Sequence, residues 1–373
     1  MKLTIDVAAT DGAARTGTIA TARGVLPTPL FMPVGTRASV KALDAGDLER
    51  LGIPLILGNT YHLMLRPGAD LIADLGGLHR FMDWSGHVLT DSGGFQIFSL
   101  EPKVTDDGAT FRSTYDGSTH HLTPEGAAEV QAKLGGDIQM VLDVCPPLPS
   151  PDRVVRAAVE RTASWGERGR RAFLDLAAWR DERGLVQSQF GICQGGIDLD
   201  LRAASARQVV DTGFDGYAVG GLSVGETREE MLPALAAALE HLPADQPRYL
   251  MGVGDPASIV EAVGLGVDLF DCVLPTRHAR HGTVLTTEGR LMIKNLASER
   301  DEGPLDATCG CPVCARYSRA YLRHLHRLGE PTAARLLTIH NVAWLSRLVV
   351  DLRSAIAEGR FDAARRAVLD VWG

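Results

Sequence analysis

Eight short apolar segments recur along the chain, separated by longer stretches whose apolar residues have helical spacing. Each segment has the length and composition of a buried strand. They span residues 29–35, 54–60, 87–94, 137–145, 189–196, 216–222, 248–254 and 268–276. Between them, residues 151–176 and 227–242 are the clearest amphipathic helices. Eight strands that alternate with helices predict an α/β fold, the closed (β/α)8 TIM barrel.

An open, doubly wound sheet is the alternative arrangement of alternating strands and helices. We would expect such a sheet to carry a phosphate-binding G-x-G-x-x-G motif after its first strand. This chain has no such motif there. The closed barrel is therefore the favoured prediction.

The composition is that of a globular enzyme, with 45% hydrophobic and 23% charged residues among 373. The first residues lack the apolar run of a secretory signal, and no stretch approaches the roughly 20 apolar residues of a membrane helix. We therefore expect a cytoplasmic protein that does not enter a membrane. The net charge of −8 restricts any nucleic-acid binding to a local basic surface.

Polar residues and glycines gather where the predicted strands end. They are Asn59, Asp91, Asp143, Gln194, Gly220, Gly221, Gly252, Gly254 and Asp271. A single Asp at such a position is usually a helix cap or a turn former. In a barrel, however, the carboxyl ends of all strands meet on one face, which is where barrel active sites form. Three Asp and one Gln that converge there predict a site.

The chemistry of these residues suits a purine. A carboxylate accepts from the N–H and NH2 edge of a base, whereas an amide and backbone N–H groups can donate to its carbonyl and ring nitrogen. Glycine pairs at 93–94, 195–196 and 220–221 allow the backbone to approach a flat ligand. Two further carboxylates suit glycosyl transfer, in which one attacks the sugar and the other moves the proton of the leaving base.

A cysteine cluster follows the last predicted strand. Cys309, Cys311 and Cys314 form C-x-C-x-x-C, and His340 lies 26 residues beyond. Three thiolates and one imidazole make a closed tetrahedral Zn²⁺ set, and four protein ligands indicate a structural metal. His324 and His326 are rival fourth ligands, and three free thiols are the alternative without a metal. Three scattered cysteines, at 145, 193 and 272, are expected to be small buried residues.

The regular alternation of predicted strands and helices ends at residue 276. Residues 281–295 predict a hairpin with a turn at Glu288–Gly289. We divide the chain into residues 1–276, the barrel with an N-terminal extension; residues 277–345, a zinc-binding insertion; and residues 346–373, a C-terminal helix that packs on the barrel.

A row of arginines suggests a phosphate-binding surface. Arg316, Arg319, Arg323 and Arg327 are spaced 3, 4 and 4 apart, so they share one helix face. Residues 309–350 contain only one acid, Glu330, to balance them. We interpret the row as a phosphate-binding stripe rather than a solvated helix face. Two arginines and two histidines would extend it to the mouth of the barrel: Arg277, Arg280, His278 and His281.

Several motifs in this order resemble the bacterial-type tRNA-guanine transglycosylases. They are LTDSGGFQIFSL, GICQGG, YAVGGLSVGE, MGVGDP, FDCVLPTRHARHG and the C-x-C-x-x-C set with its distant His, and the resemblance runs from about residue 34 to residue 341. It implies a zinc-containing barrel enzyme that exchanges the wobble guanine of G-U-N anticodons for 7-aminomethyl-7-deazaguanine (preQ1) in queuosine biosynthesis. It also implies a homodimer, and tRNA contacts within residues 277–345.

The resemblance assigns roles to particular residues. Asp271 would be the nucleophile that forms a covalent ribosyl-enzyme, and Asp91 the general acid/base. The base would be held by Asp91, Ser92, Phe95, Asp143, Gln194, Gly220, Gly221, Leu222 and Met251. RNA would be contacted by Gly252, Gly254, Arg277 and Arg280. Zinc would be held by Cys309, Cys311, Cys314 and His340.

This chain departs from the family pattern at two positions. Phe95 stands where the family usually has Tyr, so the stacking ring is kept and its hydroxyl is lost. Val144 stands where the family often has Glu, which alters the expected polar lining of the pocket. Cys145 and Val224 match the bacterial pocket and favour preQ1 over the larger queuine.

Three other functions remain as alternatives at this stage. A partner subunit without catalysis would be expected to lack one of the two catalytic acids, and both are present. A glycoside hydrolase would be expected to carry more aromatic sugar platforms than 6% aromatic residues provide. A relative that inserts deazaguanines into DNA differs from the favoured function only in its nucleic-acid substrate.

Overall fold

A closed barrel of parallel strands forms the centre of the molecule. The computed structural model describes residues 3–373. Neighbouring barrel strands are hydrogen-bonded in the order β4 (Leu30–Gly35), β5 (Leu55–Gly58), β6 (His87–Thr90), β10 (Ile138–Met140), β11 (Ser188–Cys193), β12 (Gly216–Val219), β13 (Arg248–Leu250) and β14 (Leu269–Cys272). Strand β14 pairs with β4 and closes the circle. The predicted barrel is confirmed, and the open sheet is wrong.

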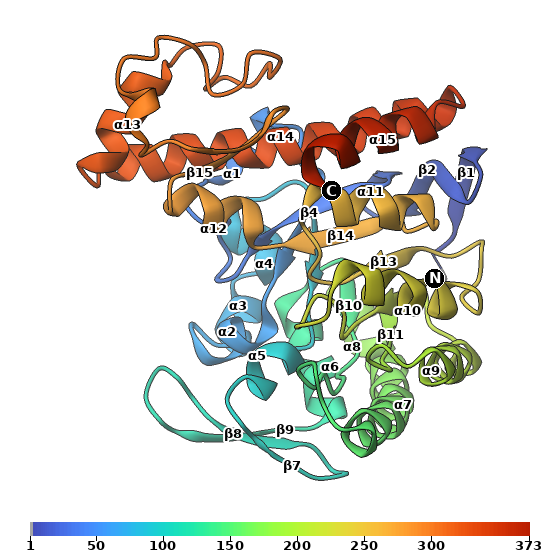
Figure 1. Cartoon of the computed structure of the whole chain (residues 1–373). Coiled ribbons are helices and arrows are strands. Elements are labelled where there is room, and N and C mark those ends of the chain that lie inside the picture. The colour runs from blue at the N-terminus through green and yellow to red at the C-terminus, as the bar shows by residue number, and fades with distance from the viewer. Residues whose placement is uncertain (1–2) are drawn as a thin grey trace.

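Helices between the strands cover the barrel (Figure 1). Those of the first half are α1 (Ala45–Arg50), α2 (Thr60–Leu65), α3 (Ala69–Asp74), α4 (Gly77–Met82), α5 (Gly94–Phe98) and α6 (Pro124–Leu134). Those of the second half are α7 (Asp152–Asp175), α8 (Ala177–Asp181), α9 (Leu199–Thr212), α10 (Arg228–Leu239), α11 (Pro256–Gly264) and α12 (Leu274–Arg280). The two predicted amphipathic helices correspond to α7 and α10. Helix α10 begins at a capping box, in which Thr227 and Glu230 satisfy each other's backbone N–H.

Two antiparallel sheets lie outside the barrel. One contains β1 (Ile5–Asp11), β2 (Ala14–Thr21) and β3 (Gly24–Thr28), and it precedes the first barrel strand. The other contains β7 (Lys103–Val104), β8 (Ala109–Arg112) and β9 (Thr119–Leu122), and it follows α5 (Figure 1). The sequence pattern did not indicate the second sheet, because its strands are short and largely exposed.

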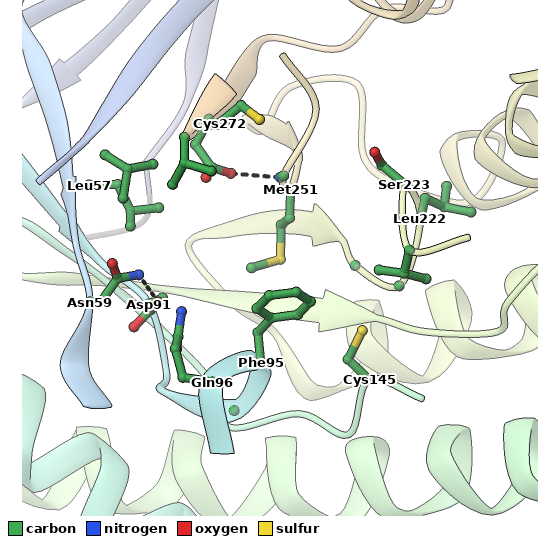
Figure 2. A pocket seen from close by; sticks show the side chains of 18 of the residues that line it. Leu57, Asn59, Asp91, Phe95, Gln96, Cys145, Leu222, Ser223, Met251 and Cys272 are labelled. Carbon is green, nitrogen blue, oxygen red and sulfur yellow. Dashed lines mark hydrogen bonds between the residues drawn. The ribbon is translucent and has the colours of Figure 1, made fainter. Parts of the chain in front are cut away.

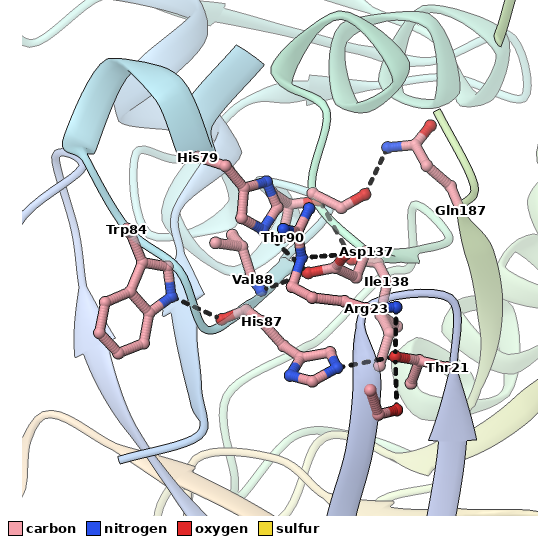
Figure 3. Close-up of polar contacts among 12 residues, drawn as sticks. Thr21, Arg23, His79, Trp84, His87, Val88, Thr90, Asp137, Ile138 and Gln187 are labelled. Carbon is pink, nitrogen blue, oxygen red and sulfur yellow. Dashed lines mark hydrogen bonds and ion pairs between the residues drawn. The ribbon is translucent and has the colours of Figure 1, made fainter. Parts of the chain in front are cut away.

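Ion pairs attach the N-terminal sheet to the amino ends of the barrel strands. Arg15 Nε donates to Asp268 Oδ1 at 2.9 Å, and both side chains are buried. Arg23 Nε, in the turn between β2 and β3, donates to Asp137 Oδ1 at 2.8 Å (Figure 3). The other oxygen of Asp137 accepts from Val88 N at 2.8 Å and contacts His79 Nε2 at 3.0 Å. The sheet thus fastens the end of the barrel opposite the cavity described below.

The segment after β14 begins with the predicted hairpin. Strands β15 (Thr283–Thr286) and β16 (Gly289–Met292) pair with Thr286 opposite Gly289, so the turn residues are Thr287 and Glu288. The expected turn at Glu288–Gly289 was therefore wrong by one residue. Gly289 begins the second strand with φ of +104°, a conformation that glycine adopts without strain.

The chain ends in three helices after a short 3-10 turn, η1 (Leu296–Ser298). They are α13 (Arg319–Arg327), α14 (Pro331–Ala357) and α15 (Phe361–Trp372). In Figure 1 they lie across one side of the barrel. The division of the chain at residues 277 and 346 stays a proposal, and both positions fall inside helices. Within residues 3–373, no helix is both long enough and apolar enough to cross a membrane.

Candidate active site and metal centre

A cavity of about 410 Å³ opens at the carboxyl ends of the barrel strands (Figure 2). Predicted site residues supply much of its wall: Asp91, Ser92, Phe95, Asp143, Gly220, Gly221, Leu222, Met251, Gly252, Asp271 and Arg277. Gln194 is buried beneath this wall. Gly254 is buried against Cys272, so its expected contact with RNA would have to be indirect. Arg280 is exposed one helical turn beyond Arg277.

One oxygen of Asp271 is fixed and the other is free. Tyr249 OH donates to Oδ1 at 2.5 Å, and Gly252 N donates to the same oxygen at 2.7 Å. No hydrogen bond from residues 3–373 reaches Oδ2. Burial raises the pKa of Asp271, although both donors favour its charged form. The Asp271 carboxylate is therefore held in one orientation, and its Oδ2 accepts no hydrogen bond within residues 3–373.

Asp91 lies on the wall of the same cavity and is more fully hydrogen-bonded. Its Oδ1 accepts from Thr60 N at 2.7 Å and Gly93 N at 3.1 Å, and its Oδ2 accepts from Asn59 Nδ2 at 2.5 Å. Burial nevertheless raises the pKa of Asp91 to about 6. A carboxyl group with this pKa can give or take a proton near neutral pH.

Asp143 forms a second polar group with two neighbours. Gln194 Nε2 donates to Asp143 Oδ2 at 2.6 Å, and Ser92 Oγ lies 3.4 Å from Oδ1. Burial raises the pKa of Asp143 to about 6 as well. Gln194 Oε1 is buried without a hydrogen-bond partner in the described chain. This group can therefore accept from a ligand while remaining held from behind.

The two departures from the family pattern fall in different places. Phe95 is 61% exposed at the cavity mouth, and it points toward Met251 on the opposite wall (Figure 2). A flat ring could be held between these two side chains. Val144 instead packs among apolar residues that include Tyr61 and Trp165. The expectation that Val144 alters the polar lining is therefore wrong, because it does not line the cavity.

Two polar contacts in the site were not anticipated. Tyr249, which was assigned only to a strand, donates a side-chain hydrogen bond to Asp271, and Asn59 donates one to Asp91. Strand alternation places Tyr249 toward the barrel interior, where a buried hydroxyl needs a hydrogen-bond partner. This alternation could have indicated from the sequence that Tyr249 takes part in a polar contact. Gln96 also lines the cavity, and no feature of the sequence distinguished it.

Three thiols and one imidazole converge in the C-terminal segment. The ligand atoms of Cys309, Cys311, Cys314 and His340 all lie within 4.8 Å of one another. His340 Nδ1 lies 3.2 Å from Cys314 Sγ, and its Nε2 lies 2.8 Å from the carbonyl oxygen of Leu285. That carbonyl can only accept, so it fixes the proton on Nε2 and leaves the Nδ1 lone pair toward the sulfurs. The group could hold a metal ion, with His340 rather than His324 or His326 as its imidazole.

The predicted arginine stripe is largely neutralised. Arg319 Nη1 pairs with Asp301 at 3.0 Å, and Arg323 Nη1 pairs with Glu299 at 3.1 Å. Arg323 is also buried, and Arg316 precedes the first residue of α13. Both acids lie just upstream of the segment in which we had counted one acid. The stripe interpretation is therefore wrong for the two central arginines.

Unpaired cations lie instead around the cavity mouth. Arg277 and Arg280 on α12 are exposed, and no carboxylate in residues 3–373 forms an ion pair with them. Arg37 and Arg66 follow β4 and β5, and their guanidinium carbons lie 5.1 and 4.6 Å from the centre of the Tyr115 ring. Because β14, β4 and β5 are consecutive in the barrel, these cations occupy adjoining positions on its rim.

Comparison with known proteins identifies the family. The family profile described as queuine tRNA-ribosyltransferase matches residues 10–373. A protein of that name from Novosphingobium aromaticivorans is 51% identical over 364 residues, which cover 97% of this chain and 96% of that protein. The chain belongs to the queuine tRNA-ribosyltransferase family. It is accordingly an enzyme of the pentosyltransferase class.

Two further relatives agree with this assignment. A queuine tRNA-ribosyltransferase from Desulforudis audaxviator is 51% identical over 358 residues, covering 95% of this chain and 94% of that protein. Another from Sphingopyxis alaskensis is 50% identical over 366 residues, covering 98% and 96%. The similarity therefore includes both the barrel and the C-terminal segment that carries the cysteines.

The raised pKa of Asp143 predicts a stability cost that depends on pH. Its pKa is 3.8 in the unfolded chain and about 6 when buried, a difference of about 3 kcal/mol in the charged form. This cost is absent below about pH 4, grows up to about pH 6 and is constant above it. Asp143→Asn should therefore raise the free energy of unfolding by up to about 3 kcal/mol at pH 8 and by no more than about 0.5 kcal/mol near pH 4.

Urea unfolding of both proteins at pH 8 and pH 4 measures this difference. Asp351→Asn is the matched control, because Asp351 is 56% exposed and pairs only with Arg347, also at the surface. Its effect should be within about 0.5 kcal/mol at both pH values. An Asp143→Asn protein that is no more stable than the parent at pH 8 would contradict the assignment of a burial cost.

Proposed function

We propose that this enzyme exchanges a guanine in tRNA for a 7-deazaguanine base by double displacement. The observation that carries the proposal is the arrangement at Asp271, which lines the same cavity as Asp91. Its Oδ1 is held by Tyr249 and Gly252, while its Oδ2 accepts no hydrogen bond within residues 3–373. A carboxylate oriented in this way can attack the sugar carbon of a bound nucleotide. The name of the related proteins, queuine tRNA-ribosyltransferase, supports tRNA as the substrate.

In the first displacement, an oxygen of Asp271 forms a bond to ribose C1′. The bond between C1′ and N9 of guanine breaks, and its electron pair goes to the departing base. Asp91 in its protonated form gives that base a proton. In the second displacement, Asp91 accepts a proton from the incoming base, whose nitrogen attacks C1′ and releases the Asp271 carboxylate. The pKa of Asp91, about 6, suits a group that must work in both directions.

The cavity wall offers recognition for a guanine-like base. Asp143, held by Gln194, would accept from the N–H and NH2 edge, and Phe95 and Met251 would hold the two faces of the ring. The wall also includes Cys145 and Val224, and we propose preQ1 as the incoming base on that ground. The target nucleotide must leave its stack to reach this depth, as in other enzymes that act on bases.

The remaining components of the proposal concern partners and the metal. Arg277 and Arg280, with Gly252, would contact the anticodon loop, since these cations are unpaired at the cavity mouth. We propose Zn²⁺ for the cysteine cluster because three thiolates and an imidazole are its preferred closed set. We also propose a homodimer, which would cover exposed apolar side chains such as Leu71, Leu75 and Phe81, and a cytoplasmic location.

Asp271→Asn tests the proposed nucleophile. An amide cannot form the ribosyl ester, so exchange of labelled guanine into tRNA should fall by about 10⁴-fold or more. The covalent adduct, seen as a tRNA-shifted protein band under denaturing conditions, should disappear. Tyr249→Phe keeps the carboxylate and should retain the adduct with slower exchange. Full exchange by the Asp271→Asn protein would defeat the assignment.

Metal analysis tests the zinc proposal. Protein purified without chelators should contain about one Zn²⁺ per chain, and Cys311→Ala should lose it together with the stability of the C-terminal segment. His326→Ala should retain the metal, because His326 lies outside the cluster. A zinc content far below one per chain, or equal content in both variants, would reject this ligand set.

The salt dependence of tRNA binding tests the rim cations. Replacing Arg277 and Arg280 together by Ala should make the negative slope of log affinity against log salt shallower by about 1.5 to 2. The loss of affinity should be greatest at low salt. Arg319→Ala is the control, because Arg319 is already paired with Asp301 and its loss should leave the slope unchanged. An unchanged slope in the double variant would exclude phosphate contacts by these two residues.

A further inference from the structure

Arg202 is a fully buried cation behind the cavity wall. It lies on α9 with 0% of its surface exposed, and no carboxylate in residues 3–373 forms an ion pair with it. Its guanidinium approaches the Cys193 thiol and otherwise donates to main-chain carbonyls of residues 3–373. Nε donates to Gly196 O at 2.8 Å, Nη1 to Cys193 O at 3.2 Å and Gly220 O at 2.7 Å, and Nη2 to Gly221 O at 3.0 Å.

These contacts orient two peptide groups of the cavity wall. The peptide bonds that follow Gly220 and Gly221 are trans, so each N–H points away from the carbonyl that Arg202 holds. The N–H groups of Gly221 and Leu222 are thereby directed away from Arg202, and both residues line the cavity on its other side. Arg202 therefore orients the N–H groups of Gly221 and Leu222 from the side of the wall opposite the cavity.

Both N–H groups lack a good acceptor within the protein. The N–H of Gly221 approaches the thiol of Cys145, which is a weak acceptor. No hydrogen bond within residues 3–373 uses the N–H of Leu222. The next two amides, of Ser223 and Val224, are by contrast both taken by the carboxylate of Glu226. Buried N–H groups normally have partners, so the Leu222 N–H is available to a bound molecule and the Gly221 N–H is only weakly satisfied.

The packing around Arg202 and the cavity wall leaves no room for side chains at Gly195 and Gly221. A Cβ on Gly195 would lie 2.8 Å from Arg202 N, and a Cβ on Gly221 would lie 2.1 Å from Gln194 Oε1. Gly221 also has φ of +64°, which other residues rarely adopt. Glycine at these two positions lets the Arg202 helix and the Gln194 side chain pack directly against the main chain.

We propose that Arg202 is a positioning residue for the leaving and entering base, a role that rests on the proposed function. It aims the N–H groups of Gly221 and Leu222 at the ring carbonyl oxygen of guanine and polarises them. When the C1′–N9 bond breaks, the electron pair that enters the purine spreads onto this oxygen. Donors fixed before the reaction stabilise such charge more than mobile water does.

A buried cation with no carboxylate in direct contact is unfavourable for folding, which argues against a purely structural role. The acid that acts on Arg202 is Glu226, whose carboxylate is bonded to the amides of Ser223 and Val224. Burying a charge without a counter-charge costs stability, and an apolar side chain of similar volume often replaces buried ions without loss. A buried positive charge beneath a site where negative charge develops is, in contrast, useful to the reaction. Arg180 is also buried, but it lies against Phe173 O, and no residue of its surroundings lines the cavity.

The experiment compares two bases that differ at the position the N–H groups would contact. Guanine carries a carbonyl oxygen there, and 2,6-diaminopurine carries an amino group that cannot accept. The N1 of 2,6-diaminopurine also lacks the proton that guanine would donate to Asp143, so each variant is compared with the parent enzyme for the same base. Inhibition constants of both bases are measured in the tRNA exchange assay for the parent enzyme, Arg202→Met and Arg202→Lys. The Lys variant keeps the charge, removes the planar fork and is the one more apt to fold.

We expect the constant for guanine to rise tenfold or more in Arg202→Met and at least threefold in Arg202→Lys, while that for 2,6-diaminopurine changes less than twofold. Arg180→Met should change thermal stability and leave both constants as they are. A parallel change for both bases in the Lys variant, or no change in either, would overturn the inference. If the parent enzyme itself exchanges no guanine, the proposed function fails instead, so the two failures are distinguishable.

Discussion

The pairing of β14 with β4 is the contact on which the site depends. It sets Asp271 beside Met32 and joins the last barrel strand to the first. Strand β6, which ends before Asp91, then lies only two strands further round the ring. In an open sheet, β14 would be an edge strand far from β6. Closure therefore brings two carboxylates from distant parts of the sequence to one cavity.

Burial raises the pKa values of Asp91 and Asp143 and thereby allows proton transfer near neutral pH, but holding these groups in the charged form lowers the stability of the fold. Both Asp91 and Asp143 are held by several donors, yet desolvation still raises the pKa of each to about 6. The energy needed to hold charge in this cavity comes from the surrounding core, which is built of the barrel strands and their covering helices. The barrel end opposite the cavity is fastened independently, through Arg15 and Arg23 of the N-terminal sheet. Stability and reactivity are thus placed at opposite ends of one barrel.

The positive charges of this acidic protein fall into two kinds. Arg319 and Arg323 on α13 are paired with nearby acids, in the segment that carries the cysteine cluster. Arginines on the barrel rim have no such partners and remain available to a polyanion. Arg202 belongs to neither kind, because its partners are carbonyl dipoles instead of carboxylates. The distribution of acids around each cation, rather than the number of cations, decides what each can bind.

The sequence by itself determined the barrel, the acids at strand ends and the three thiols of the metal-ligand set, whereas the structure selected His340 as the imidazole. Those features are local: strands have a recognisable length, and the spacing of Cys309, Cys311 and Cys314 is visible in six residues. Only the tertiary structure decided the partners of these residues. Tyr249 is hydrogen-bonded to Asp271, Arg319 to Asp301, and Arg202 to the carbonyl of Gly221. The residues of each pair are brought together by packing, and neither helical nor strand periodicity in the sequence predicts these contacts. A side chain's type fixes which bonds it can make, whereas the fold fixes which partner lies within 3 Å of it.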